Sequence, residues 1–167
     1  MKRLFCAGCA VLAVLAWSSM SQAALVKYKV LLDGHQEVDA MGNPDKGDLD
    51  GEGVARLIID SDTLSITWDI TAENIDFPLI GAHIHEAPAG TNGPVKIDFN
   101  AQLSGSGLVD PDLANVIANP AGFYVNLHNS AFQSGAIRGQ IGQPVPEPGT
   151  VVLAGIGLAA LALWRRK

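Results

Sequence analysis

The fold class that the sequence predicts is all-β: an antiparallel sandwich or barrel with one short helix. Two observations carry this prediction. Many apolar stretches are short and alternate apolar with polar residues, as strands with one face in water do. Turn residues such as Gly, Pro, Asn and Asp separate these stretches at short intervals. In the central part of the chain a helix is expected from Asp110 to Ile117, because Asp110 can cap it and Pro111 suits its first position.

The first expected strand runs from Leu25 to Leu32. Its residues alternate, so one face carries the set Val26, Tyr28, Val30 and Leu32, and the other face carries two lysines and two leucines. We therefore expect the first face to pack in the core and the second face to meet water.

A long acidic loop is expected from Asp33 to Gly53. Its alternating acids Asp48, Asp50 and Glu52 are typical of the start of an EF-hand calcium loop. The bidentate Glu that the motif requires at position twelve is replaced by Ile59, and the following residues favour a strand. The sequence therefore excludes an EF-hand and leaves two interpretations open, a looser calcium loop and a solvated acidic loop.

Two further strands, Val54–Ile59 and Thr63–Ile70, are expected to form a hairpin around Asp60-Ser61-Asp62. One face of the second strand is apolar throughout and is assigned to the core: Leu64, Ile66, Trp68 and Ile70. Trp68 is interpreted as a core anchor, with a platform for ligand stacking as the alternative.

The stretch Gly81–Val95, GAHIHEAPAGTNGPV, carries the most chemistry. Residues i and i+2 of a strand point to the same face, so His83 and His85 should project side by side while Ile84 points away. The Pro, Gly and Asn residues that follow predict a shaped loop, because they favour fixed or positive backbone angles.

The remaining elements are a strand over Val95–Phe99, a loop at Ser104–Gly107, and two closing strands. The first closing strand, Phe123–Asn129, is rich in aromatic and β-branched residues and contains a third histidine, His128. The second, Gly135–Ile141, follows a short turn. Arg138 points away from the apolar face of this strand, and we expect it to pair with a carboxylate.

The stretches GAHIHEAPAGTNGPV and FYVNLHNSAFQSGAIRGQI resemble the CHRD domain, a family named for chordin that also occurs in bacterial secreted proteins. The family pattern of H-I-H, G-x-N-G-P, Y-V-N-x-H and G-x-I-R-G-Q is matched nearly throughout. We assign residues 24–143 to this domain. The resemblance implies an immunoglobulin-like or superoxide-dismutase-like antiparallel β-sandwich outside the cytoplasm, and it implies no particular activity.

Imidazoles from one i, i+2 pair and from a second strand can form a three-nitrogen metal site, and copper or zinc would suit it. We therefore predict a metal site made of His83, His85 and His128. The alternative is that these are hydrogen-bonded strand residues that fix loops. Copper–zinc superoxide dismutases contain a similar G-x-H-x-H-E stretch, but only His35 remains here for a second metal, so dismutase activity is not expected.

Residues 1–23 are interpreted as a secretory signal peptide. The basic start MKR, the apolar run Leu4–Trp17 and the small residues after it follow the order that such peptides have. Cleavage is expected between Ala23 and Ala24, and an N-terminal membrane anchor is the alternative. Both cysteines of the chain lie in this segment, so the mature domain must be held together by core packing or metal.

Residues 144–167 resemble a PEP-CTERM sorting tail. The signature Pro146, Glu147 and Pro148 precedes an apolar run over 150–164, expected to be a short membrane helix, and the chain closes on Arg-Arg-Lys. The resemblance implies export across the inner membrane of a Gram-negative bacterium, transient anchoring there, processing by an exosortase-type enzyme, and delivery to the cell surface or extracellular matrix. An ordinary C-terminal anchor is the alternative.

The composition narrows the function classes. Residues 24–143 hold sixteen of the seventeen acidic residues and six of the eleven basic residues, a net charge of −10, which does not favour nucleic acid as a partner. The sequence has no nucleophile with a recognisable base, no phosphate loop and no patterned carboxylate pair. We predict a non-enzymatic exported module that associates with extracellular polysaccharide or another surface protein, with metal binding as the alternative function.

Overall fold

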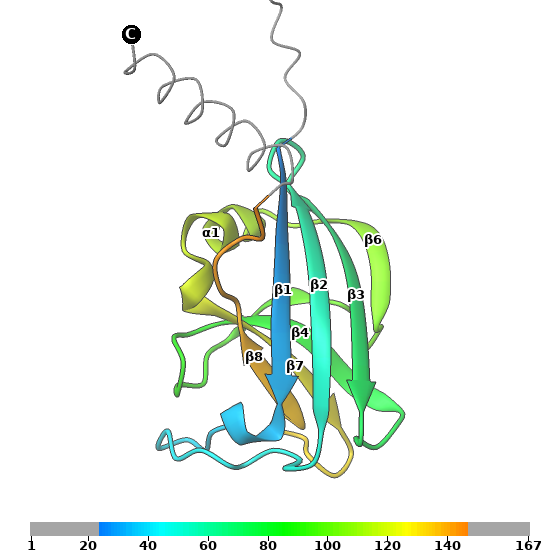
Figure 1. Ribbon diagram of the computed structural model, residues 1–167, viewed down its shortest axis with the longest axis vertical. Coiled ribbons are helices and arrows are strands. Elements are labelled where there is room, and N and C mark those ends of the chain that lie inside the picture. Colours follow the sequence, from blue (N-terminus) through cyan, green and yellow to red (C-terminus); the bar gives the residue numbers. More distant parts are fainter. Residues whose placement is uncertain (1–23, 147–167) are drawn as a thin grey trace, which may run out of the picture.

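Eight antiparallel strands form one curled sheet in the computed structural model, which describes residues 24–146 (Figure 1). The strand order across the sheet is β5-β4-β7-β8-β1-β2-β3-β6. The strands are β1 (Leu25–Asp33), β2 (Glu52–Asp60), β3 (Ser65–Glu73), β4 (Leu79–Glu86), β5 (Val95–Asp98), β6 (Ser104–Val109), β7 (Phe123–Asn129) and β8 (Ile137–Gln140). The connections hold one α-helix, α1 (Leu113–Ala118), and two short 3-10 helices, η1 (Gly34–Gln36) and η2 (Pro120–Gly122).

The predicted all-β antiparallel fold with one short helix is confirmed, but the predicted sandwich of two separate sheets is corrected. The two halves of the sheet meet where β8 pairs with β1, and Asp33 and Arg138 form the one registered pair there. A Cβ atom on Gly139 would lie 2.1 Å from the carbonyl oxygen of Leu31, so this glycine permits the close approach. The chain therefore forms a half-barrel, where an immunoglobulin-like or superoxide-dismutase-like sandwich was expected.

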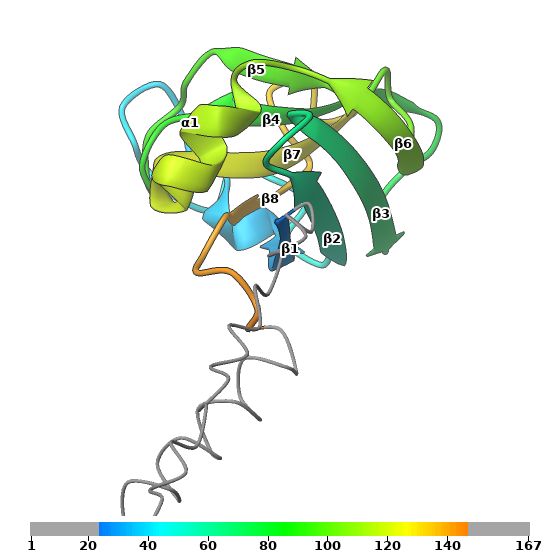
Figure 2. The same cartoon turned by 90° about the horizontal axis from the view of Figure 1, so that it is seen from above.

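The core lies inside the curl of the sheet. On the apolar face predicted for β1, Tyr28, Val30 and Leu32 are buried and Val26 is partly buried, and Ile66 and Ile70 on β3 are buried as well. Helix α1 contributes Leu113 and Val116, both fully buried, and Figure 2 shows it beside β4 and β5. The helix begins later than predicted: its N-cap position is Asp112, whose backbone N–H donates to the carboxylate of Asp110 at 2.9 Å.

Trp68 joins the two edges of the half-barrel. Its ring stacks on that of Phe99, directly after β5, with centroids 4.5 Å apart, and its Nε1 donates to the carbonyl oxygen of Gln102 at 3.0 Å. The indole is 8% exposed, which confirms the core anchor. The predicted loop at Ser104–Gly107 is wrong, because these residues belong to β6. A Cβ on Gly105 would lie 2.3 Å from the Trp68 ring, so this glycine makes room for the indole and does not mark a loop.

Several predictions concern residues outside the described range. These are the signal peptide over residues 1–23, the signature residues Glu147 and Pro148, and the apolar segment 150–164. Of the proposed processing sites, Ala24 and Pro146 are the ones that the structure describes. Between residues 24 and 146, none of the helices has the length and apolar character needed to cross a bilayer.

The two ends of the described chain lie beside each other at the start of β1. The backbone N–H of Ser61 donates to the carbonyl of Ala24 at 3.2 Å, and the N–H of Val145 donates to the carbonyl of Lys27 at 2.7 Å. Figure 1 shows the turn between β7 and β8 at the opposite end of the sheet. The half-barrel therefore has one end at which its chain enters and leaves, and a far end formed by loops.

Candidate metal centre

The three predicted histidines meet on the outer face of the sheet. Ala82 and Ile84 of β4 are fully buried in the core, so His83 and His85 point to the other face. His128 of β7 lies opposite Gly81 in the register, one step diagonal to His83. Ring centroids are 5.5 Å apart for His83 and His85, 5.1 Å for His83 and His128, and 5.6 Å for His85 and His128. The predicted clustering is confirmed, and one nitrogen of each ring lies within 4.8 Å of the others.

Each imidazole has one ring nitrogen directed at an oxygen acceptor. His85 Nδ1 lies 2.9 Å from the carbonyl oxygen of Gly93, and His128 Nδ1 lies 3.1 Å from that of Gln133. His83 Nε2 lies 3.4 Å from Oδ1 of Asp98 on β5. Because a carbonyl oxygen only accepts, the contacts of His85 and His128 place the N–H of these two rings on Nδ1.

The second nitrogen of each ring is buried and without a hydrogen-bond partner: His83 Nδ1, His85 Nε2 and His128 Nε2. A buried polar atom without a partner is rare and demands an explanation. Metal-binding histidines have this arrangement, with one nitrogen on the metal and the other N–H held by a carboxylate or a backbone carbonyl. The cluster could therefore hold a metal ion, with all three rings already oriented.

Burial keeps the three rings neutral. It lowers the pKa of His128 to about 4, against a partial rise from the Gln133 carbonyl, and the neighbouring histidines lower it further. Burial also lowers the pKa of His85, and it lowers that of His83 although Asp98 acts in the opposite direction. Only neutral imidazole can ligate a metal, so the ligating form is the one populated at neutral pH.

A depression of about 190 Å³ gives access to the cluster from solvent, and its walls are Ile80, Gly81, the three histidines, Val95 and Gln133. Gly81 makes room for the rings. A Cβ atom there would lie 2.6 Å from Cε1 of His83 and 3.2 Å from Cδ2 of His128. The glycine of the G-A-H-I-H motif is therefore part of the site.

A second layer of buried side chains supports His85 from behind. Its ring stacks on Tyr124, and the guanidinium carbon of Arg138 lies 3.5 Å from the centre of the same phenol ring. Arg138 donates to the carbonyl oxygen of Thr91 at 2.9 Å, to that of Pro88 at 3.3 Å and to Oδ1 of Asn92 at 3.3 Å. These bonds fix the loop after β4, whose Gly93 carbonyl contacts His85.

Arg138 was expected to pair with a carboxylate, and its hydrogen bonds go to this loop instead. Glu37 is nevertheless close enough to feel its charge. Burial raises the pKa of the Glu37 carboxyl to about 7, although Arg138 and a hydrogen bond from Asn126 lower it in part. In addition to the histidines, this carboxyl is therefore a buried group whose pKa is shifted.

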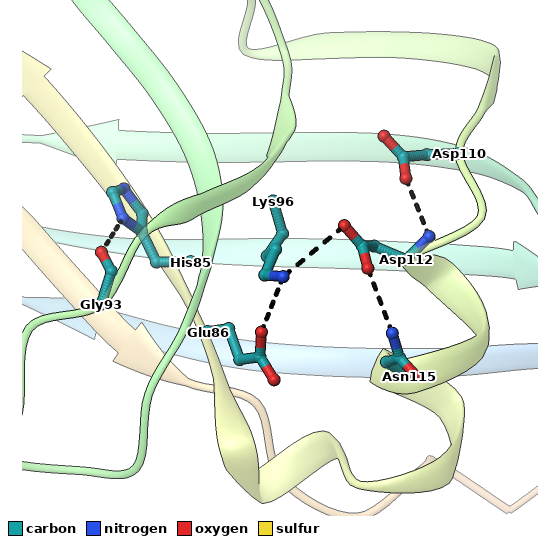
Figure 3. A network of polar contacts seen from close by, with 7 residues as sticks. All are labelled: His85, Glu86, Gly93, Lys96, Asp110, Asp112 and Asn115. Atoms are coloured by element: carbon teal, nitrogen blue, oxygen red, sulfur yellow. Dashed lines mark hydrogen bonds and ion pairs between the residues drawn. The ribbon is translucent and has the colours of Figure 1, made fainter.

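An ion-pair network holds the edge strand β5 in place. Lys96 of β5 lies 2.9 Å from Oε2 of Glu86 on β4 and 3.9 Å from Oδ2 of Asp112 at the start of α1 (Figure 3). The same view shows His85 directed at the Gly93 carbonyl. Strand β5, which carries Val95 and leads to Asp98, is therefore tied to the strand that bears two of the histidines.

The fourth histidine and the acidic loop lie apart from the cluster. His35 is exposed and its Nδ1 contacts Oδ1 of Asp45 at 2.8 Å. The pKa of Asp48 is raised by burial and by the nearby carboxyls of Asp50 and Asp76. Within residues 24–146, the three histidines are the group of ligating side chains that lies close enough together to hold one metal ion. The side chains of the acidic loop do not form such a group there, so the structure does not support the looser calcium loop.

The sequence did not reveal the partners that orient the rings. Two of them are backbone carbonyls, of Gly93 and Gln133, and a carbonyl carries no residue-type signal. Asp98 stood in a predicted strand, but its place opposite His83 depends on the β4–β5 register. The N-G-P turn signal did predict the tight loop that contains Gly93.

Comparison with known families agrees with both resemblances. The family described as CHRD domain matches residues 28–141, and the one described as PEP-CTERM protein-sorting motif matches residues 144–167. A comparison with curated proteins and another with solved structures gave no match.

Proposed function

The chain belongs to the CHRD domain family and ends in a PEP-CTERM sorting motif, and from this premise we propose that it is an exported surface protein that binds copper or zinc through His83, His85 and His128. The sorting motif implies export and processing by an exosortase. The observation that carries the metal proposal is the set of three buried, unpartnered imidazole nitrogens in one cluster.

The donor set selects the metal. Three neutral imidazoles suit copper and zinc, whereas calcium and magnesium require oxygen ligands. Zinc sites with three histidines occur in proteins with an open fourth position. Binding to the folded state alone would also stabilise a domain that has no cysteine between residues 24 and 146 and therefore no disulfide there.

We further propose a non-enzymatic role in the envelope or extracellular matrix, as an interaction or structural module associated with extracellular polysaccharide or another surface protein. Transient anchoring in the inner membrane would precede it. The arrangement of the ends supports an outward-facing metal centre. Both ends of the described chain lie beside the start of β1, whereas His128 contacts Gln133 in the turn at the far end of the sheet (Figure 1).

The test is a melting curve of the mature protein, stripped of metal by a chelator and titrated with copper(II) or zinc at about pH 7.5, where imidazole is mostly neutral. Metal bound only by the folded state should stabilise by roughly 2.7 kcal/mol at a hundredfold excess over Kd. His83→Ala, His85→Ala or His128→Ala should each remove most of the shift, and His35→Ala should retain it. Absence of a shift with either metal, or an equal shift in His83→Ala, would refute the proposal.

A further inference from the structure

We propose that a metal ion held by the three histidines keeps an open coordination position on its solvent side, and that a small monodentate anion binds there in place of water. This inference rests on the metal function proposed above. It goes further in naming what the loaded centre would bind. The step is a ligand exchange, in which one metal–water bond breaks, one metal–anion bond forms, and no electron is transferred.

The cluster has fewer donors than the metal takes. Zinc takes four ligands in most protein sites and copper(II) takes at least four, whereas the cluster offers three. Within residues 24–146, no Asp, Glu, Cys or further His joins the group. Asp98 contacts Nε2 of His83, and the unpartnered atom of that ring is Nδ1, so this carboxylate serves to orient the ring.

The cluster is reached from solvent through a depression. All three histidines line it, together with Ile80 and Val95. These two side chains are 55% and 47% exposed and carry no donor atom, so neither can supply a fourth ligand.

Charge favours an anion at the open position. Three neutral imidazoles leave the full charge of a divalent ion uncompensated, and the guanidinium of Arg138 lies nearby, against the Tyr124 ring on which His85 stacks. The carboxylate in contact with the cluster, Asp98, lies on the outer nitrogen of one ring. An anionic donor is therefore favoured over a neutral one at the open position.

Gln133 is the one wall residue whose side chain could compete. Its backbone carbonyl accepts from His128, and its exposed amide side chain lies at the rim of the depression. If the amide oxygen took the fourth position, no exogenous ligand would bind until that side chain was removed. The Gln133→Ala variant therefore distinguishes a closed site from an open one.

The experiment loads the mature protein with copper(II) and titrates it with azide, a small monodentate anion, while absorption and electron paramagnetic resonance are recorded. We expect a saturable azide-to-copper charge-transfer band at one azide per copper, with copper retained. Val95→Glu should weaken azide binding about tenfold or more, because a carboxylate at the rim repels and competes with the anion. Leu31→Glu, which changes another exposed apolar residue, on β1 and outside the walls of the depression, should bind azide as the parent does.

The outcomes separate the two proposals. Copper binding with no azide band in either the parent or Gln133→Ala would overturn the open position and leave the metal function intact. A band that appears only in Gln133→Ala would show that the amide closes the site, and it would overturn the inference as well. Failure of the protein to bind copper or zinc would refute the metal function, and the inference would fall with it.

Discussion

The imidazole ring of His85 lies flat against the phenol ring of Tyr124, with ring centroids 4.9 Å apart and planes 9° from parallel. The two residues are also linked through the loop after β4. Gly93 donates its N–H to the Tyr124 hydroxyl at 3.2 Å, and its carbonyl lies 2.9 Å from His85 Nδ1. Tyr124 therefore orients His85 twice, by stacking and by holding the residue that accepts its N–H.

Tyr124→Phe should weaken metal binding while keeping the stacked ring. The hydroxyl acceptor is lost, the N–H of Gly93 is left without it, and the Gly93 carbonyl is held less firmly under His85. Loss of an outer partner of a metal ligand costs about 10–100-fold in affinity. Competition with a chromophoric chelator measures the effect.

The matched control is Tyr28→Phe, since the buried Tyr28 hydroxyl has no hydrogen-bond partner. This variant should bind metal as the parent does and should be no less stable. Equal metal affinity in the parent and Tyr124→Phe would show that the loop does not orient His85.

Gly81→Ala should also lower metal affinity. The added Cβ would lie 2.6 Å from His83 Cε1 and must push that ring out of place. The backbone of Gly81 does not have the positive φ that would disfavour alanine, so the effect should fall on the rings more than on the fold. Isothermal titration with zinc measures the effect on metal affinity, and a melting curve of the metal-free protein measures the effect on the fold.

Gly142→Ala is the control for this substitution, because no atom lies within 4 Å of a Cβ at that position. We expect it to bind zinc as the parent does. If Gly81→Ala bound zinc with unchanged affinity, the rings would have room to spare and the role assigned to Gly81 would be wrong.

The metal-free protein should show two opposing pH effects on the free energy of unfolding. The pKa of His128 falls from 6.5 to about 4 on folding, so between these values the unfolded chain binds the proton and stability rises with pH. The pKa of Glu37 rises from 4.5 to about 7, so the native state holds that proton and stability falls as pH rises through this range. The two contributions partly cancel between about pH 4.5 and 6.5.

Glu37→Gln removes the contribution of Glu37, which opposes that of His128. The rise in the free energy of unfolding from pH 4.5 to pH 6.5 should therefore be larger in this variant than in the parent. Denaturant unfolding in the presence of a chelator, at these two pH values, gives the comparison. The same pH dependence in both proteins would mean that the Glu37 carboxyl titrates in the ordinary range.

Strand alternation explains why the metal cluster could be predicted from the sequence. H-I-H within an apolar strand fixes two rings on one face, and the aromatic and β-branched run Phe123–Asn129 placed the third ring on another strand. That this strand is the neighbour of β4 was seen only in the structure. The nitrogen that each ring presents could not be predicted. It depends on the carbonyls of Gly93 and Gln133, which any residue type would supply.

The curvature of the sheet was beyond sequence reasoning for a different reason. Short alternating strands predict antiparallel pairing but not whether two sheets separate or stay joined. Here a single registered pair, Asp33 with Arg138, keeps them joined. Gly105 led to the wrong prediction of a loop, because a glycine that accommodates Trp68 looks the same in sequence as a glycine in a loop.

Trp68→Ala should destabilise the protein by about 3–5 kcal/mol, because it removes a buried indole and its stacking on Phe99. Leu31→Ala is the control: Leu31 is 63% exposed, and a change within about 0.5 kcal/mol is expected. Denaturant midpoints measure both. A loss under about 1 kcal/mol for Trp68→Ala would contradict the core role and favour a platform for stacking sugars.

Processing should leave a mature protein that begins near Ala24 and lacks the chain beyond about Pro148. The order of basic, apolar and small residues at the start predicts the first cleavage. The sorting motif over 144–167 implies the second. Val145 still bonds to Lys27 on β1, so removal of the later residues should leave the melting temperature unchanged. Mass spectrometry of the released protein is the measurement, and Glu147→Ala should keep the tail attached and the protein in the membrane fraction. Released protein that retained residues 150–164 would contradict the prediction.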